Sequence, residues 1–318
     1  MKMPAQSSRN VGIDLFRCVL VLGIILYHIF LYNDHAYWFE PKIWTWCVPG
    51  FAFISGYYGV KFKLSKVVRL WTVAALCAIV PWAILRGEGS YLELFYGNWY
   101  LTAYTILILM SPIINAGLNL MHETKNYTPL VGVGAIAFWA WLGDMHFVRN
   151  FIPQASGIGA LTFSSVFVAY VLAWTYREFP NVWSRISPWW LLPLIPAMAV
   201  FGHYDSPFAL LFTVLLFSAF TEINLSPRLS AFARRVGEAG FAVYLIHANP
   251  KMLKLIDRGV SICIDEWHCP KYLAYLACAL AVYFTCVLLY WFAVILLRQI
   301  SPLYNRLLRR LDFKIIDR

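Results

Sequence analysis

The first apolar segment of the sequence carries three ionisable side chains. Residues 14–30 read DLFRCVLVLGIILYHIF, with Asp14 and Arg17 at one end and His28 near the other. On an α-helix, the spacing between Arg17 and His28 corresponds to about three turns, about 16 Å, and a net rotation of only about 20°. The two side chains therefore share one face, and Asp14 stands one turn before Arg17, where the two can pair.

Two interpretations of this face are open. Arg17 could lie at the membrane interface with its charge neutralised by Asp14, and His28 could make an interhelical hydrogen bond. Ionisable groups inside apolar spans usually face a cavity or a pathway, however. An imidazole at such a place can take a proton as a general base. The shared face therefore favours a functional site.

The composition predicts an integral membrane protein. Of 318 residues, 61% are hydrophobic and only 13% are charged, and the mean hydropathy is +0.63. Soluble domains are about 25% charged, and one soluble core does not grow large enough to bury this much apolar surface. The net charge of +10 forms no basic stripe on a soluble module, so we expect no nucleic-acid partner.

Ten apolar windows predict an all-α bundle of about ten transmembrane helices, forming a single domain over residues 1–318. They are 15–32, 43–60, 67–85, 99–118, 129–143, 157–175, 189–203, 207–222, 238–256 and 272–297. Most Lys and Arg residues fall on one side of this arrangement. The positive-inside rule then places the N-terminal residues 1–12 and the basic tail 299–318 in the cytoplasm. The polar start of the chain, with no cleavage site after it, predicts no cleavable signal.

Five segments carry a resemblance to a known family. IDLFR (13–17) opens an R-x10-H pattern formed by Arg17 and His28; FAFISGYYG (51–59), KLSKVVRLW (63–71), NWYLTAY (98–104) and FAVYLIHA (241–248) follow in order. Together they resemble the acyltransferase-3 family of integral membrane acyltransferases over nearly the whole chain. One departure stands out. That family often has Pro directly after the late His, whereas here HANP places Pro250 three residues after His247.

The resemblance implies an O-acyltransferase of the plasma (inner) membrane. Its donor would be cytoplasmic acyl-CoA, most often acetyl-CoA, and its acceptor a hydroxyl of a cell-surface or lipid-linked glycan. His28 would be the catalytic base, and Arg17, paired with Asp14, would serve the acyl-CoA or the acyl intermediate. Lys66 and Arg69 stand one helical turn apart at the inner end of the third expected span, so both can bind one phosphate of coenzyme A. No metal is expected.

Four further residues are candidates for substrate binding: Ser55, Trp99, Tyr104 and His247. Each also has a structural interpretation. The step from Ser55 to the following glycine would allow close helix packing, Trp99 and Tyr104 would belong to an aromatic belt, and His247 would be a packed polar residue. In the outer loop SICIDEWHCPK, Cys263 and Cys269 could form a disulfide if that side is oxidising.

Two other classes of function remain open. A transporter could use Arg17, His28 and His247 as a substrate or proton path, although no inverted repeat is evident. A non-catalytic scaffold is the third class, but the short loops offer little surface for partners. If the chain is an acyltransferase, the position of His28 beyond the middle of its helix favours transfer in the outer half of the membrane.

Overall fold

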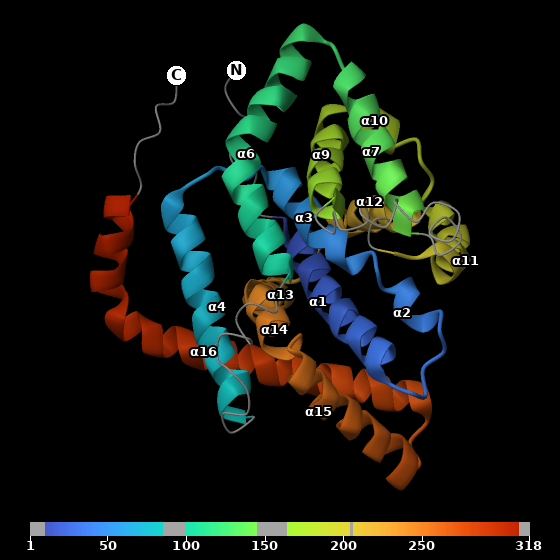
Figure 1. Cartoon of the computed structure of the whole chain (residues 1–318), viewed down its shortest axis with the longest axis vertical. Helices are drawn as coiled ribbons and strands as arrows, with labels where there is room; N and C mark the ends of the chain where they lie inside the picture. Colours follow the sequence, from blue (N-terminus) through green and yellow to red (C-terminus); the bar gives the residue numbers. More distant parts are fainter. Residues whose placement is uncertain (1–9, 85–98, 145–163, 204–205, 312–318) are drawn as a thin grey trace.

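The computed structural model describes residues 10–84, 99–144, 164–203 and 206–311, and these residues form helices and turns without a strand. The all-α prediction is confirmed. The helices, labelled in Figure 1 where room allows, are α1 (Val11–Tyr32), α2 (Glu40–Ile43), α3 (Cys47–Tyr58), α4 (Leu64–Ile84), α6 (Trp99–Thr124), α7 (Thr128–Asp144), α9 (Ser164–Glu178), α10 (Pro180–Trp183), η2 (Pro188–Trp190), α11 (Leu191–Phe201), α12 (Pro207–Thr221), α13 (Pro227–Glu238), α14 (Gly240–His247), α15 (Pro250–Ser261), the π-helical turn η3 (Ile262–Glu266) and α16 (Lys271–Leu311).

Among the described residues, four helices are long and apolar enough to cross a membrane. They are α1, α4, α6 and the segment Lys271–Ile295 of α16, which indicates a multi-pass membrane protein. Shorter apolar helices, among them α3, α9 and α12, occupy other expected spans with 12 to 15 residues, fewer than the about 20 that a straight crossing needs. The start of the sixth expected span, residues 157–163, lies outside the described residues.

The expectation of one continuous span over 238–256 is wrong. The chain leaves the helix after His247, and a new helix begins at Pro250. Asn249 caps the new helix, because its side chain accepts a hydrogen bond from the Lys251 amide at 3.0 Å. Pro250 occupies the first turn, where its missing N–H costs nothing. The result is two short helices, α14 and α15, and His247 is the last residue of the first.

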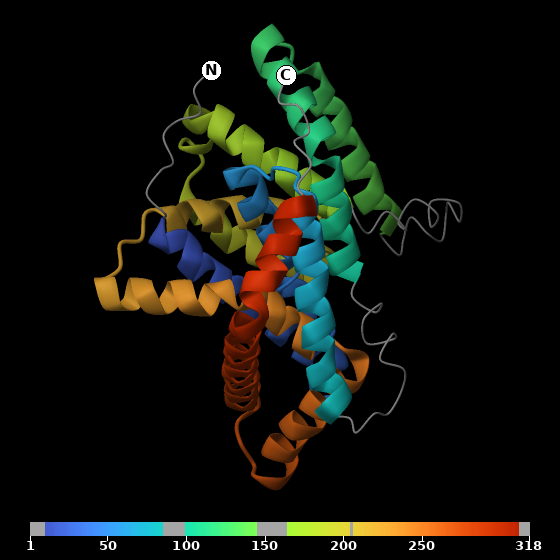
Figure 2. The ribbon, with the colours of Figure 1, turned by 90° about the vertical axis from the view of Figure 1, so that its left-hand side faces the viewer.

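The described part of the basic tail expected over 299–318 is helical. Residues up to Leu311 continue α16, and residues 312–318 lie outside the described part of the chain. In Figure 1, α16 crosses the lower part of the bundle and then turns upward along its last third. The α6–α7 hairpin projects at the opposite end, as Figures 1 and 2 both show.

Helix α1 is the centre of the bundle and positions the residues singled out above. It packs against α2, α3, α12, α13, α14, α15 and α16. The side chain of Asn10 caps its start, accepting a hydrogen bond from the Ile13 amide and donating one to the Thr221 carbonyl. The face that Arg17 and His28 share lies against the α13–α14 segment, because Arg17 lines a cavity with Gly237 and His28 contacts His247.

Close packing of α3 on α9 depends on Gly56. A Cβ atom at this position would lie 2.4 Å from the Tyr170 carbonyl oxygen and 2.9 Å from the Ala173 Cβ. We expect Gly56→Ala to lower the free energy of unfolding by about 1–3 kcal/mol, because the two helices must separate. The measurement is thermal unfolding in detergent. Gly117→Ala is the matched control, since no described atom lies within 4 Å of a Cβ there; equal melting temperatures of the two variants would contradict the assignment.

Candidate functional site

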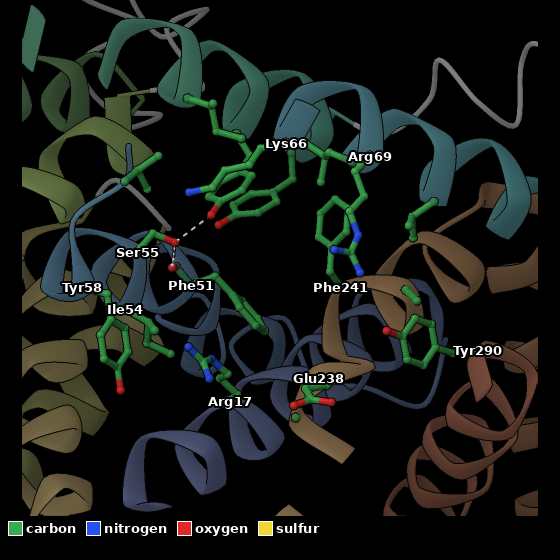
Figure 3. Close-up of a pocket in the computed structure, with 18 of the residues that line it drawn as sticks. Arg17, Phe51, Ile54, Ser55, Tyr58, Lys66, Arg69, Glu238, Phe241 and Tyr290 are labelled. Carbon is green, nitrogen blue, oxygen red and sulfur yellow. Dashed lines mark hydrogen bonds between the residues drawn. The ribbon is translucent and has the colours of Figure 1, made fainter. Parts of the chain in front are cut away.

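A cavity of about 560 Å³ opens beside the N-terminal half of α1. It collects side chains from six helices that are far apart in the sequence, α1, α3, α4, α6, α14 and α16, and from the end of α13. This volume falls in the range of small-molecule and cofactor sites. Figure 3 shows Arg17 and Glu238 on one side of the cavity and Lys66 and Arg69 on the other.

Arg17 reaches the cavity from α1 as a paired cation. Its Nη1 lies 2.6 Å from Oδ1 of Asp14, whose side chain is buried. The guanidinium also lies over the ring of Tyr58, 5.8 Å from its centroid. The expected pairing is therefore present, and it leaves Arg17 about a quarter exposed toward the cavity.

Lys66 and Arg69 reach the same cavity from the first turns of α4. Lys66 Nζ also donates to the Lys61 carbonyl at 3.3 Å. Lys61 and Lys63 precede the helix, are exposed and do not line the cavity. With Arg17, the site holds three cations, which suits a ligand that carries phosphate groups.

Ser55 and Tyr104 line the cavity and contact each other. Ser55 Oγ donates to the Phe51 carbonyl at 3.0 Å, so the Tyr104 hydroxyl, 3.1 Å away, donates to Ser55. Tyr100 lies one helical turn before Tyr104, and the rings of the two tyrosines stack with their planes 12° apart. Its hydroxyl is buried and has no hydrogen-bond partner among the described residues. An unpaired buried hydroxyl is costly, so Tyr100 is a candidate ligand contact.

The expected aromatic belt is not what these tyrosines form. Trp71 Nε1, two residues after Arg69 on α4, donates to Thr105 Oγ1 at 3.0 Å, so the start of α6 lies at the depth of the cavity. Tyr100 and Tyr104 consequently face the site. Trp99 packs against the core instead and does not line the cavity.

Glu238 and Tyr290 are two polar residues of the cavity that were not candidates from the sequence. Glu238, at the end of α13, places a carboxylate on the side of Arg17, opposite Lys66 and Arg69, and Tyr290 comes from α16. Helix α13 packs on α1, and α16 packs on both α1 and α4. In the sequence, Glu238 stands three positions before the start of the resembling segment 241–248, and this proximity is the only signal that could have suggested it.

His28 and His247 are in direct contact. Nδ1 of His28 lies 3.1 Å from Nε2 of His247, and Nδ1 of His247 lies 2.7 Å from the Val243 carbonyl oxygen. His247 is 1% exposed, whereas His28 is only partly buried. Neither histidine is among the residues that line the cavity.

One layer of aromatic rings separates this pair from the cavity. Tyr100 lines the cavity, and its ring centroid lies 5.8 Å from that of Tyr244. The Tyr244 ring in turn lies 6.3 Å from the His247 ring. The face shared by Arg17 and His28 thus lines a cavity at its Arg17 end and meets another helix at its His28 end.

The disulfide that Cys263 and Cys269 could form is not present in the structure, where all seven cysteines are free thiols. The Cys269 amide donates to the Cys263 carbonyl at 2.9 Å. The Cys263 sulfur instead lies 3.9 Å from the sulfur of Cys278, a residue of α16.

Comparison of the chain with protein-family profiles, curated proteins and solved structures finds no match in any of the three. The resemblance to the acyltransferase-3 family therefore rests on the five sequence segments. The structure adds that residues from each of these segments lie within one connected region around α1: Arg17, Ser55, Lys66, Tyr104 and His247.

Proposed function

We propose that the protein is a membrane O-acyltransferase of the acyltransferase-3 type. It moves an acyl group, for which acetyl is the first candidate, from acyl-CoA to a hydroxyl of a cell-surface or lipid-linked glycan. The observation that carries the proposal is the cavity where Arg17, Lys66 and Arg69 meet beside α1. Three cations from two separate segments make a site for the phosphates of coenzyme A. Lysines and arginines of α4 and α13 at this end of the bundle favour a cytoplasmic mouth.

The His28–His247 pair supplies the acid–base group of the reaction. The pantetheine arm extends from the cations along α1, and its acyl end passes the layer of Tyr100 and Tyr244. The acceptor hydroxyl oxygen then attacks the thioester carbonyl carbon while its proton moves to His28. The carbon–sulfur bond breaks, the ester forms, and the proton passes from His28 to the departing thiolate of coenzyme A.

A labelling experiment tests this function. The purified protein, in vesicles of the lipids from its expression host, is given acetyl-CoA labelled in the acetyl group. We expect free coenzyme A thiol to appear and the label to enter the glycan or lipid-linked sugar fraction, with slow hydrolysis when no acceptor is present. Intact acetyl-CoA and an unlabelled glycan fraction would overturn the proposal.

Transport is the alternative that the same residues could serve. Arg17, His28 and His247 would then line a path for a substrate or a proton. In the structure an aromatic layer separates the His28–His247 pair from the cavity. This separation applies equally to both functions, so the fate of the thioester bond distinguishes them. A transporter would load sealed vesicles with the probe and leave its thioester bond intact, whereas an acyltransferase would break that bond.

We expect the unpaired hydroxyl of Tyr100 to donate a hydrogen bond to the bound acyl-CoA. Tyr100→Phe should weaken acetyl-CoA binding roughly threefold to tenfold, the value of one net hydrogen bond, without loss of thermal stability. Titration calorimetry of the detergent-solubilised protein measures the affinity. Tyr283→Phe is the control, because its hydroxyl is equally buried but lies away from the cavity. A loss of affinity that is the same in both variants would count against this contact.

A further inference from the structure

The hydrogen-bond partners of His247 fix which nitrogen of His28 carries a proton. A backbone carbonyl oxygen can only accept, so Nδ1 of His247, 2.7 Å from the Val243 oxygen, carries a proton and donates it. In a neutral imidazole the other nitrogen is then an acceptor. Nε2 of His247 therefore presents its lone pair to Nδ1 of His28 at 3.1 Å.

Nδ1 of His28 must therefore carry a proton and donate a hydrogen bond to this lone pair. Two unprotonated nitrogens at 3.1 Å would repel each other. Nδ1 of His28 is therefore protonated, and Nε2 of the neutral His28 ring is unprotonated. The reverse direction would need a doubly protonated His247. That ring is 1% exposed and has no carboxylate partner among the described residues, and a buried unpaired charge is expensive.

We infer that His247 is a positioning residue that holds His28 in the tautomer with its Nε2 free to act as a base. The chain of donors runs from His28 to His247 to the Val243 carbonyl, all of it supplied by α1 and α14. No described residue hydrogen-bonds to Nε2 of His28, so this nitrogen is left for the reacting hydroxyl. The hydrogen bond from Nδ1 of His28 to Nε2 of His247 also stabilises the imidazolium that forms when His28 takes the proton.

The rigidity of α14 makes this arrangement specific. Val243 lies one turn before His247 on the same helix and is itself fully buried. Gly240, at the start of α14, lies so close to α1 that a Cβ there would stand 2.8 Å from Val21 Cγ2. The acceptor for His28 is thus held by helix packing rather than by a loop, which fixes the ring of His28 as well as its tautomer.

Two substitutions test the two hydrogen bonds of His247 one at a time: the bond to His28 and the bond to the Val243 carbonyl. His247→Gln places an amide oxygen near the position of Nε2 and keeps an acceptor for His28. His247→Asn places its amide near the position of Nδ1, so it keeps a contact with the Val243 carbonyl but loses His28. We expect the Asn variant to lower kcat on the order of tenfold to a hundredfold with the KM for acetyl-CoA unchanged, and the Gln variant to recover most of kcat.

Nitrogen-15 NMR of histidine-labelled protein in detergent reads the tautomer directly. Wild-type His28 should show a protonated Nδ1 and a bare Nε2, and His247→Asn should mix the two tautomers. A wild-type His28 with a protonated Nε2, or a tautomer that is unchanged in the Asn variant, would overturn the inference. Its kinetic arm rests on the proposed function, but the NMR arm does not. A wild-type protein with the expected tautomer and no acyl transfer would refute the function alone.

Discussion

His28→Ala protein is expected to fold and to bind acetyl-CoA, yet to lose acyl transfer by about 10²–10⁴-fold, the usual contribution of a general base. Binding should survive because His28 does not line the cavity that holds the cations. The measurement combines the rate of acetyl transfer with the affinity for acetyl-CoA in the same preparation. Full turnover by the variant would remove His28 from the mechanism.

A second variant distinguishes loss of the base from loss of packing. In His28→Asn the amide nitrogen lies near the position of Nδ1 and can still donate to His247, but no group replaces Nε2. It should therefore be as inactive as the Ala variant while melting closer to wild type. His35→Ala serves as the control, because His35 is exposed just beyond the end of the same helix, and its hydrogen-bond partners among the described residues are Asn33 and Asp265. It should keep full activity.

Removal of either cation of α4 is expected to weaken the use of acetyl-CoA. A charge-assisted hydrogen bond contributes about 1.5–3 kcal/mol, so Lys66→Ala or Arg69→Ala should raise the KM for acetyl-CoA roughly tenfold to a hundredfold. With acetyl-pantetheine as donor, which lacks the nucleotide and its phosphates, the variants and the wild type should be equally poor. The comparison of the two donors shows whether the lost binding free energy comes from contacts with the phosphates of coenzyme A.

The control for this experiment lies in the same segment. Lys63 is exposed, carries the same charge and does not line the cavity, so Lys63→Ala should change KM little. If it raised KM as much as Lys66→Ala, general attraction of anions would explain the result. Equal losses with acetyl-CoA and acetyl-pantetheine would likewise argue against a phosphate site at α4.

Local periodicity was sufficient to predict the α1 part of the site. Asp14, Arg17 and His28 lie on one helix, where spacing alone sets which side chains share a face. Their pairing and shared face are present in the structure. The position of Lys66 and Arg69 on one turn of α4 follows from the same rule.

The rest of the site depends on packing between segments, which a single sequence does not encode in its periodicity. His28 and His247 are 219 positions apart, and the shift of α6 along α4 that brings Tyr104 into the cavity is set by tertiary contacts. The helix break after His247 is a different case. Asn249 and Pro250 are a cap followed by a first-turn proline, and this pair is a helix-start signal inside the apolar window 238–256.

That break also separates two parts of the chain that are attached to α1 in different ways. Helix α14 is bound to α1 by tight packing at Gly240 and by the histidine contact. Helix α15 is held at the far end of α1, where Asn33 Nδ2 donates to Asp257 Oδ1 at 2.7 Å. Because α14 ends at His247 and a separate helix begins at Pro250, substitutions or insertions in α15 can reshape one surface of the protein while the residues that orient His28 stay in place.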